Sequence, residues 1–206
     1  MKKGQLVAAA VIFLMTAAAA HAQIRLDVAI SGAGVLSRTT SSSNGTITDA
    51  PTKSVAVFGT VRYHPKKLHA FELNIGHTSN SQMFAVPPDT YRVMTGITEF
   101  TGAYVFTPFS GPKWQPFLLA GGGTLRFSPG NTYIDQIQNT FGTSDQTSLA
   151  FVYGAGTDYV LWKALAVRLQ YRGLIYRNPD FGVPSRFYTG AKGHMAEPAV
   201  GLVVKF

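Results

Sequence analysis

The stretch HMAEPAVGLVVKF, residues 194–206, decides how the chain folds. Counted back from Phe206, every second residue is apolar, ending at Ala196. The intervening positions hold small residues, Met195 and two charged residues, Glu197 and Lys205. Successive side chains of a β-strand point to opposite faces, so a repeat of two residues predicts a strand. One face of this strand is apolar and the other is mixed.

The same alternation recurs in seven earlier segments, which gives eight predicted strands. They are residues 24–36, 54–63, 68–78, 92–106, 114–127, 147–161, 164–176 and 194–206. Polar connections rich in Gly and Pro separate them and alternate in length. The long ones are 37–53, 79–91, 128–146 and 177–193, and the short ones are turns at 64–67, 107–113 and 162–163. This arrangement predicts an all-β, up-and-down antiparallel sheet.

Each predicted strand has one bulky apolar face and one face of small residues with isolated charges. In a soluble sheet, the apolar face covers a core and the polar face meets water. Here the second face is built of Gly, Ala, Ser and Thr, which suits the inside of a narrow tube, while the bulky face suits lipid. For strand 114–127 we assign the apolar, lipid-facing side to Phe117, Leu119, Gly121, Gly123, Leu125 and Phe127.

Charged residues collect on the small-residue face. They are Arg25, Asp27, Arg62, Glu72, Glu99, Arg126, Asp158, Arg168, Arg172, Glu197 and Lys205. A charge at the middle of a bilayer costs about 2–4 kcal/mol, and this sorting avoids that cost. A charge buried alone is also unfavourable, so the acidic and basic groups are expected to pair. We therefore predict a charge network inside the barrel.

Aromatic residues on the apolar faces gather near the short turns. They are Tyr63, Phe71, Phe106, Phe117, Tyr159 and Phe206, and a second belt is expected from Phe127, Phe151 and Tyr171. Such belts mark the two lipid–water boundaries. Hydrocarbon does not tolerate an open sheet edge, so the first and eighth strands must pair. The result is an eight-stranded antiparallel transmembrane β-barrel whose interior is filled by side chains.

The first segment predicts export from the cytoplasm. Met1-Lys2-Lys3 precedes a short apolar stretch, and Ala20-His21-Ala22 matches a cleavage site, so residues 1–22 are expected to be a signal peptide. Removing its two lysines changes the net charge from +8 to 8 − 2 = +6. The chain has no cysteine, so no disulfide stabilises the remaining domain, residues 23–206.

The signal peptide, the eight strands, the four long connections and the terminal GLVVKF resemble the small outer-membrane barrels of the OmpA-like and opacity-protein superfamily. The resemblance implies an integral protein of the Gram-negative outer membrane, with both termini and the short turns in the periplasm. It further implies that Phe206 is part of the signal read by the barrel assembly machinery. The expected role is structural or in adhesion through the surface loops.

Residues 77–80, His-Thr-Ser-Asn, are similar to the H-x-S-N motif of outer-membrane lipid A deacylases, in which His is the base and Ser the nucleophile. We expect no catalytic residue, because a strand end that runs into a polar loop explains the motif. A lipid A-modifying hydrolase using His77 and Ser79 remains the alternative, together with a narrow pore and a secreted lipocalin-like carrier.

Other ligand classes find no support in the sequence. No helix follows the glycine run at 121–123, which argues against a nucleotide loop, and we expect no cofactor. The five histidines lack the spacing of metal ligands, and the arginines form no patch for nucleic acid. The partners expected are outer-membrane lipid and the phosphates of lipopolysaccharide. The cations proposed for the phosphates are Arg38, Lys53, Arg92, Arg177, Arg186 and Lys192.

Overall fold

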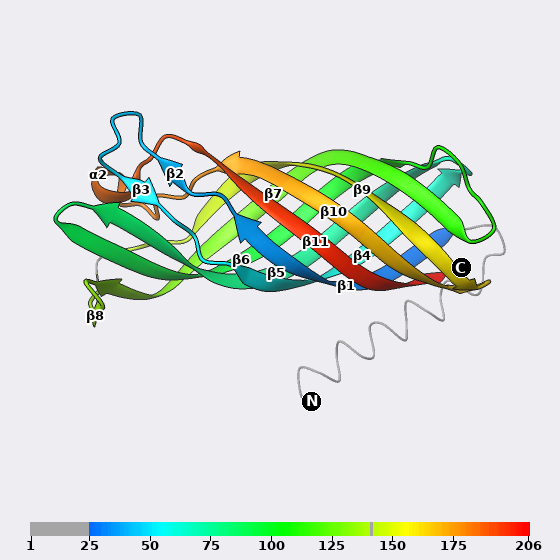
Figure 1. The fold of residues 1–206 in the computed structure, drawn as a ribbon, viewed down its shortest axis with the longest axis horizontal. Helices are drawn as coiled ribbons and strands as arrows, with labels where there is room; N and C mark the ends of the chain where they lie inside the picture. Colours follow the sequence, from blue (N-terminus) through cyan, green and yellow to red (C-terminus); the bar gives the residue numbers. More distant parts are fainter. Residues whose placement is uncertain (1–24, 141) are drawn as a thin grey trace.

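A computed structural model describes residues 25–140 and 142–206, and the signal peptide expected at 1–22 lies outside these residues. Eight long strands form one antiparallel sheet (Figure 1). They are β1 (Leu26–Ser37), β4 (Ser54–Lys66), β5 (His69–Val86), β6 (Asp89–Phe106), β7 (Trp114–Ile134), β9 (Gln146–Trp162), β10 (Leu165–Arg177) and β11 (Lys192–Lys205). The short elements are β2 (Thr40–Ser41), β3 (Thr48–Asp49), β8 (Ile137–Gln138) and the helix α2 (Pro184–Phe187).

The sheet closes on itself, as the sequence predicted. Each long strand pairs with its neighbours in the order β1, β4, β5, β6, β7, β9, β10 and β11, and β11 returns to β1 with Val28 opposite Val204. The backbone N–H of Phe206 donates to the carbonyl of Leu26 at 2.9 Å. Every long strand is therefore paired on both sides, which hydrocarbon requires. In the described part of the chain, no helix is long and apolar enough to span a membrane.

The predicted sidedness is confirmed in seven of the eight strands. Leu73, Leu169 and Leu202 are exposed on the outer surface. Glu72, Gln170 and Val203 alternate with them and are buried in the lumen. The bulky apolar side chains therefore form the outer face, where lipid would meet them.

Strand β7 is the exception, and its predicted sidedness is wrong. Leu119 is 4% exposed and Phe117 is 2% exposed, so both point into the lumen, whereas Leu118 is 55% exposed. The neighbouring strand explains the choice. Phe117 lies opposite Gly156, and Leu119 lies opposite Gly154. An added Cβ at Gly156 would come within 2.6 Å of Phe117 Cζ, so this glycine of β9 leaves the room that the ring of Phe117 fills.

The reversal of β7 also changes the aromatic belts. Phe117 and Phe127 are buried in the lumen and leave the belts assigned to them. Tyr63, Phe71, Phe106 and Phe206 are exposed at the short-turn end as predicted. The belt at that end also includes Tyr104, Trp114 and Trp162, which are exposed. At the other boundary, Phe151 and Tyr171 are exposed.

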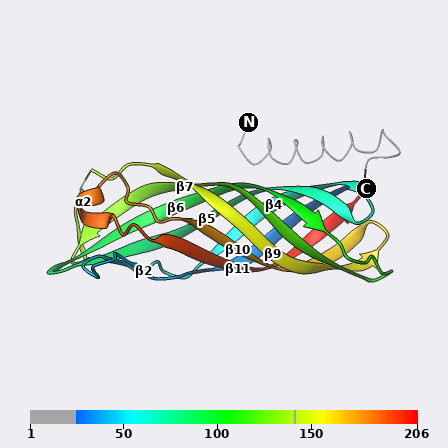
Figure 2. The same cartoon turned by 90° about the horizontal axis from the view of Figure 1, so that it is seen from above.

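Two of the predicted long loops are wrong. Residues 79–86 belong to β5, residues 89–91 belong to β6 and residues 128–134 continue β7, so β5 and β6 have 18 residues each and β7 has 21. A tilted membrane-spanning strand needs about 9–11 residues, so these three strands extend past a bilayer at the long-loop end. Figure 2 shows the resulting elongated tube. Residues 79–82 are all polar, which is typical of a loop. A strand that extends beyond the bilayer into water also carries polar side chains, so composition alone does not separate the two.

Candidate functional site

The lumen contains a charge network that crosses the barrel. Arg62 of β4 contacts Glu72 of β5, with Nη2 and Oε2 at 2.6 Å. Arg168 of β10 donates to Asp158 of β9, with Nε and Oδ1 at 2.7 Å. These two pairs lie on opposite walls and are joined across the lumen, because Arg168 reaches Glu72 at 3.5 Å and Arg62 reaches Asp158 at 3.8 Å. Four charged side chains therefore bridge the full width of the tube.

The aromatic ring of Phe117 supports both arginines of this group. The guanidinium carbon of Arg62 lies 4.2 Å from the ring centroid and that of Arg168 lies 5.2 Å from it. A guanidinium over an aromatic face gains cation–π attraction, and the gain is larger where water is excluded. The inward orientation of Phe117 thus serves the charge network.

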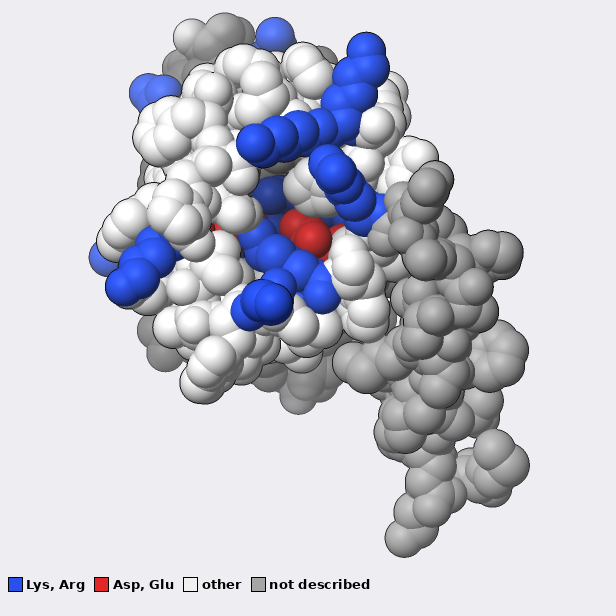
Figure 3. All heavy atoms as spheres, turned by 90° about the vertical axis from the view of Figure 1, so that its right-hand side faces the viewer, with Lys and Arg blue, Asp and Glu red and all other residues white. Residues whose placement is uncertain are grey.

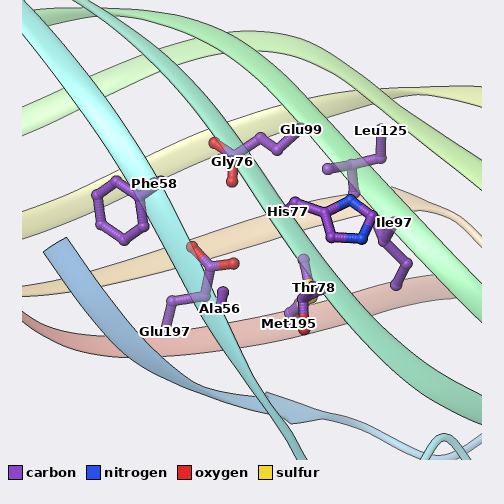
Figure 4. Close-up of a pocket in the computed structure, with 10 residues that line it drawn as sticks. All are labelled: Ala56, Phe58, Gly76, His77, Thr78, Ile97, Glu99, Leu125, Met195 and Glu197. Atoms are coloured by element: carbon purple, nitrogen blue, oxygen red, sulfur yellow. The ribbon is translucent and has the colours of Figure 1, made fainter. Parts of the chain in front are cut away.

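A second group lies further toward the long loops. Arg172 of β10 forms ion pairs with Glu99 of β6 and, at 3.6 Å, with Glu197 of β11. Its guanidinium lies 4.7 Å from the ring centroid of Phe58. A cavity of about 10 Å³ lies beside Glu99 and Glu197 (Figure 4). A cavity of this size holds about one water molecule, which makes it too small for a ligand.

We refer to these groups together as the lumen charge network. Its members are Arg62, Glu72, Glu99, Asp158, Arg168, Arg172, Glu197 and Lys205. Lys205 joins it through Asp158 at 3.5 Å and donates to Gln115 Oε1 at 2.5 Å. Four basic groups thus face four acidic groups, so the network is formally neutral. Pairing of this kind offsets the desolvation of each charge.

Two of the predicted network residues lie elsewhere, and a third, Asp27, lies inside the barrel near its opening. Arg126 is exposed on the outer face and pairs with Asp145 at 2.6 Å, a correction that follows from the reversal of β7. Arg25 precedes the first residue of β1 and is exposed at the short-turn opening, so its predicted place inside the barrel is wrong. Asp27 is buried near that opening, where it pairs with His64 at 2.8 Å.

The opposite end of the lumen is closed by a folded segment that sequence reasoning missed. We call residues 178–191, which include α2, the cap. Phe181 and Phe187 of the cap are fully buried. The ring of Phe187 stacks on Phe84 with centroids 4.4 Å apart and meets Tyr91 edge-on at 5.5 Å. The signal available in the sequence was the pair of phenylalanines in the polar connection 177–193.

Polar contacts hold the cap in place. Asn178 Nδ2 donates to Asp49 Oδ2 at 2.7 Å, and the backbone N–H groups of Asp180 and Phe181 donate to Gln146 Oε1 at 2.8 and 2.9 Å. Burial raises the pKa of Asp49 to about 7, because a desolvated carboxylate is destabilised more than the Asn178 hydrogen bond stabilises it. Asn178 therefore ties the cap to a buried carboxyl group whose pKa lies well above its usual value.

His77 and Ser79 both lie on the outer face of β5 and are exposed. His77 Nδ1 is 3.3 Å from Thr98 Oγ1. Among the described residues, no hydrogen bond joins His77 to Ser79 or to a carboxylate. The geometry thus lacks the base–nucleophile contact that activates a serine. The described residues also contain no cluster of His, Cys, Asp and Glu that could hold a metal ion.

A closed antiparallel barrel with an apolar outer face and paired charges inside is a transmembrane β-barrel. The family model described as outer membrane protein beta-barrel domain matches residues 6–206. The chain belongs to this family and is an outer-membrane protein.

Solved structures agree with the fold. Neisserial surface protein A is 17% identical, with 88% of this chain and 97% of that chain covered and a TM-score of 0.53. The outer-membrane protein OprG from Pseudomonas aeruginosa is 15% identical, with 87% and 95% covered and a TM-score of 0.50. At this level of identity the likeness extends to the fold alone. No curated protein matches the sequence.

Proposed function

We propose that the protein is a non-conducting outer-membrane barrel that presents its long-loop end for contacts at the cell surface. The observation that carries this proposal is the closed interior. The lumen charge network bridges the tube, and above it Phe181 and Phe187 fill the end of the barrel. A barrel with such an interior has no open channel, and it acts as a rigid support for its loops.

The orientation belongs to the proposal. The C-terminus lies at the short-turn end, opposite α2 and β8 (Figure 1). We place this end in the periplasm and the cap outside the cell. The chain has no cysteine, so single cysteines can report on sidedness. On intact cells, a maleimide too large to enter the periplasm should label Asn44→Cys and leave Ser110→Cys unlabelled; the reverse pattern would invert the orientation.

The chemistry of the long-loop end favours an anionic, sugar-rich partner such as lipopolysaccharide. Three arginines there lie over tyrosine rings: Arg92 over Tyr133, Arg177 over Tyr188 and Arg186 over Tyr91, each within 5.5 Å of the centroid. Arg38, Lys53 and Lys192 are exposed at the same end. Guanidinium groups pair with phosphate through two hydrogen bonds.

Lipopolysaccharide binding to the purified barrel tests this partner. Arg92→Gln, Arg177→Gln and Arg186→Gln together should weaken it. The matched triple variant Arg92→Lys, Arg177→Lys and Arg186→Lys keeps the positive charge at the same positions and should retain more of the binding. Equal binding by both variants would remove lipopolysaccharide as a partner.

Adhesion of bacteria to epithelial cells tests the surface role. Cells that display the protein should adhere better than cells that lack it. Cells displaying Phe181→Ala with Phe187→Ala, whose cap core is removed, should adhere like cells that lack the protein. Heat-dependent electrophoretic migration shows whether the variant barrel is folded. If the folded variant supports adhesion as well as the native protein does, the cap has no part in surface contact.

A further inference from the structure

The short-turn end carries lysines without acidic partners. Lys66, Lys67, Lys113 and Lys163 lie in or beside the three short turns and are exposed, and Arg25 is exposed next to them. None of these five residues forms an ion pair with any residue that the structure describes. Figure 3 views this end, where basic side chains surround the opening and acidic ones are visible only inside it.

The acids near this end are already engaged. Asp27 pairs with His64, and Asp158 is buried among Arg62, Arg168 and Lys205. A cavity of about 420 Å³ opens at the mouth, and its lining includes Arg25, Asp27, His64, Lys67 and Lys205. The positive charge of the rim is therefore not neutralised by the protein, and an anionic partner would gain by approaching it.

The same rim lies at the lipid–water boundary. Trp114 is 52% exposed and directly follows Lys113, and Trp162 is 68% exposed and directly precedes Lys163. Tryptophan rings prefer the level of the lipid head groups. A lysine beside such a ring extends its flexible stem along apolar surface and places its ammonium group at the same level. The unpaired charges thus lie where lipid phosphates are found.

We propose that this basic rim, formed by Arg25, Lys66, Lys67, Lys113 and Lys163, binds the head groups of anionic phospholipids of the phosphatidylglycerol and cardiolipin class. A phosphodiester supplies the negative charge that the rim lacks, and an anionic bilayer surface attracts each nearby basic residue. The proposed orientation would identify the leaflet as the periplasmic one. The binding itself does not depend on that orientation.

The two tryptophans allow a direct test, because they are the only ones in the chain and both belong to the rim. The protein is reconstituted in vesicles of phosphatidylcholine in which about a fifth of the lipid is phosphatidylglycerol. In one sample the phosphatidylglycerol carries quenching bromine atoms, and in the other an equal amount of the phosphatidylcholine does. We expect brominated phosphatidylglycerol to quench tryptophan fluorescence about twofold more strongly, and high salt to reduce this excess.

A charge-matched pair of variants assigns the effect to the rim. Lys66→Gln, Lys67→Gln, Lys113→Gln and Lys163→Gln together should abolish the preference. Arg38→Gln, Lys53→Gln, Arg177→Gln and Lys192→Gln remove the same charge from the other end and should retain it. Heat-dependent migration shows whether each quadruple variant is folded. If one variant does not fold, the salt dependence of quenching in the native protein still tests the inference.

Three results would overturn the inference. One is equal quenching by the two brominated lipids with the native protein. Another is an unchanged preference in the folded rim variant. The third is a loss of preference with inorganic phosphate that exceeds the loss with chloride at equal ionic strength, which would indicate a site for a soluble anion. None of these results would bear on the adhesion or labelling experiments, so the proposed surface function is tested separately.

Discussion

Arg168 is a fully buried charged side chain in the middle of the barrel. It is tolerated because Asp158 and Glu72 both accept from it, one from the adjacent strand and one from the opposite wall. An ion pair in such a place contributes little net stability, but removing one partner leaves the other charges buried and uncompensated. The network is therefore more sensitive to the loss of one member than its distances alone suggest.

We predict that Arg168→Met lowers the free energy of unfolding by about 3–5 kcal/mol. Arg126→Met is the matched control, because that arginine forms an exposed pair with Asp145 and exposed pairs contribute little. Urea unfolding in detergent micelles, followed by tryptophan fluorescence, measures both variants. If the two substitutions lowered the free energy of unfolding by similar amounts, the ion pairs of the lumen would be no more important for stability than an exposed pair.

Asp49 gives the cap a pH dependence. Its pKa is about 7 in the folded cap against an ordinary value of 3.8, so the closed cap holds a proton that an opened cap would release. The closed cap is therefore most stable when the pH is below 3.8, the ordinary pKa of an aspartate. Its stability falls as the pH rises from there to about 7 and stays nearly constant at higher pH.

Hydrogen exchange of the Asp180 and Phe181 amides should be slower at about pH 5 than at about pH 8, after correction for the intrinsic rate. Asp49→Asn, which cannot ionise, should remove this difference. Equal corrected exchange rates of the native protein at the two pH values would contradict the role given to Asp49.

At the scale of elements, alternation predicted the strands and their closure, but not the sidedness of β7. Phe117 and Phe127 lie on one parity and the charged Arg126 lies on the other, so composition favoured the wrong face. Packing decided the sidedness, because Gly156 on the adjacent strand leaves space for the ring of Phe117. The sequence predicted that Arg62, Glu72 and Arg168 belong to one group of paired charges in the lumen, but not which residue pairs with which. Their connection across the lumen depends on the tertiary structure.

Leu118 and Leu119 provide a direct comparison of the two faces of β7. Leu119→Ala should lower the free energy of unfolding by about 2–5 kcal/mol, because it leaves a cavity in the packed lumen. Leu118→Ala removes the same atoms from the outer face, where lipid or detergent fills the space, and should cost less. The comparison uses urea unfolding of the two variants in the same detergent. A larger loss for Leu118→Ala would restore the opposite sidedness.

The cap is an element that composition concealed, because its two phenylalanines lie in a polar segment. Phe187→Ala should destabilise the closed cap by about 3–5 kcal/mol. The expected result is faster hydrogen exchange within residues 178–191, with heat-dependent migration of the barrel unchanged. Tyr188→Ala is the control, because Tyr188 is the next residue in the chain and its ring is exposed. Equal effects of the two substitutions would mean that Phe187 does not anchor the cap.

At the scale of the whole molecule, the barrel combines an apolar outer wall, a bridged lumen and a capped end. Each feature follows from the same sorting of side chains, in which charges are enclosed with one another and bulky apolar groups face outward. Three long strands carry the barrel past the bilayer, so that the cap and its arginine–tyrosine pairs stand clear of the hydrocarbon. This construction suits a support for surface contacts.

Conductance across a planar lipid bilayer is the most direct test of the closed interior. The purified, folded protein should insert without producing discrete current steps, because paired side chains bridge the lumen and the cap fills its end. Insertion is verified independently by its heat-dependent migration after recovery from the membrane. Reproducible unitary current steps from the native protein would contradict a filled lumen and would make the barrel a pore.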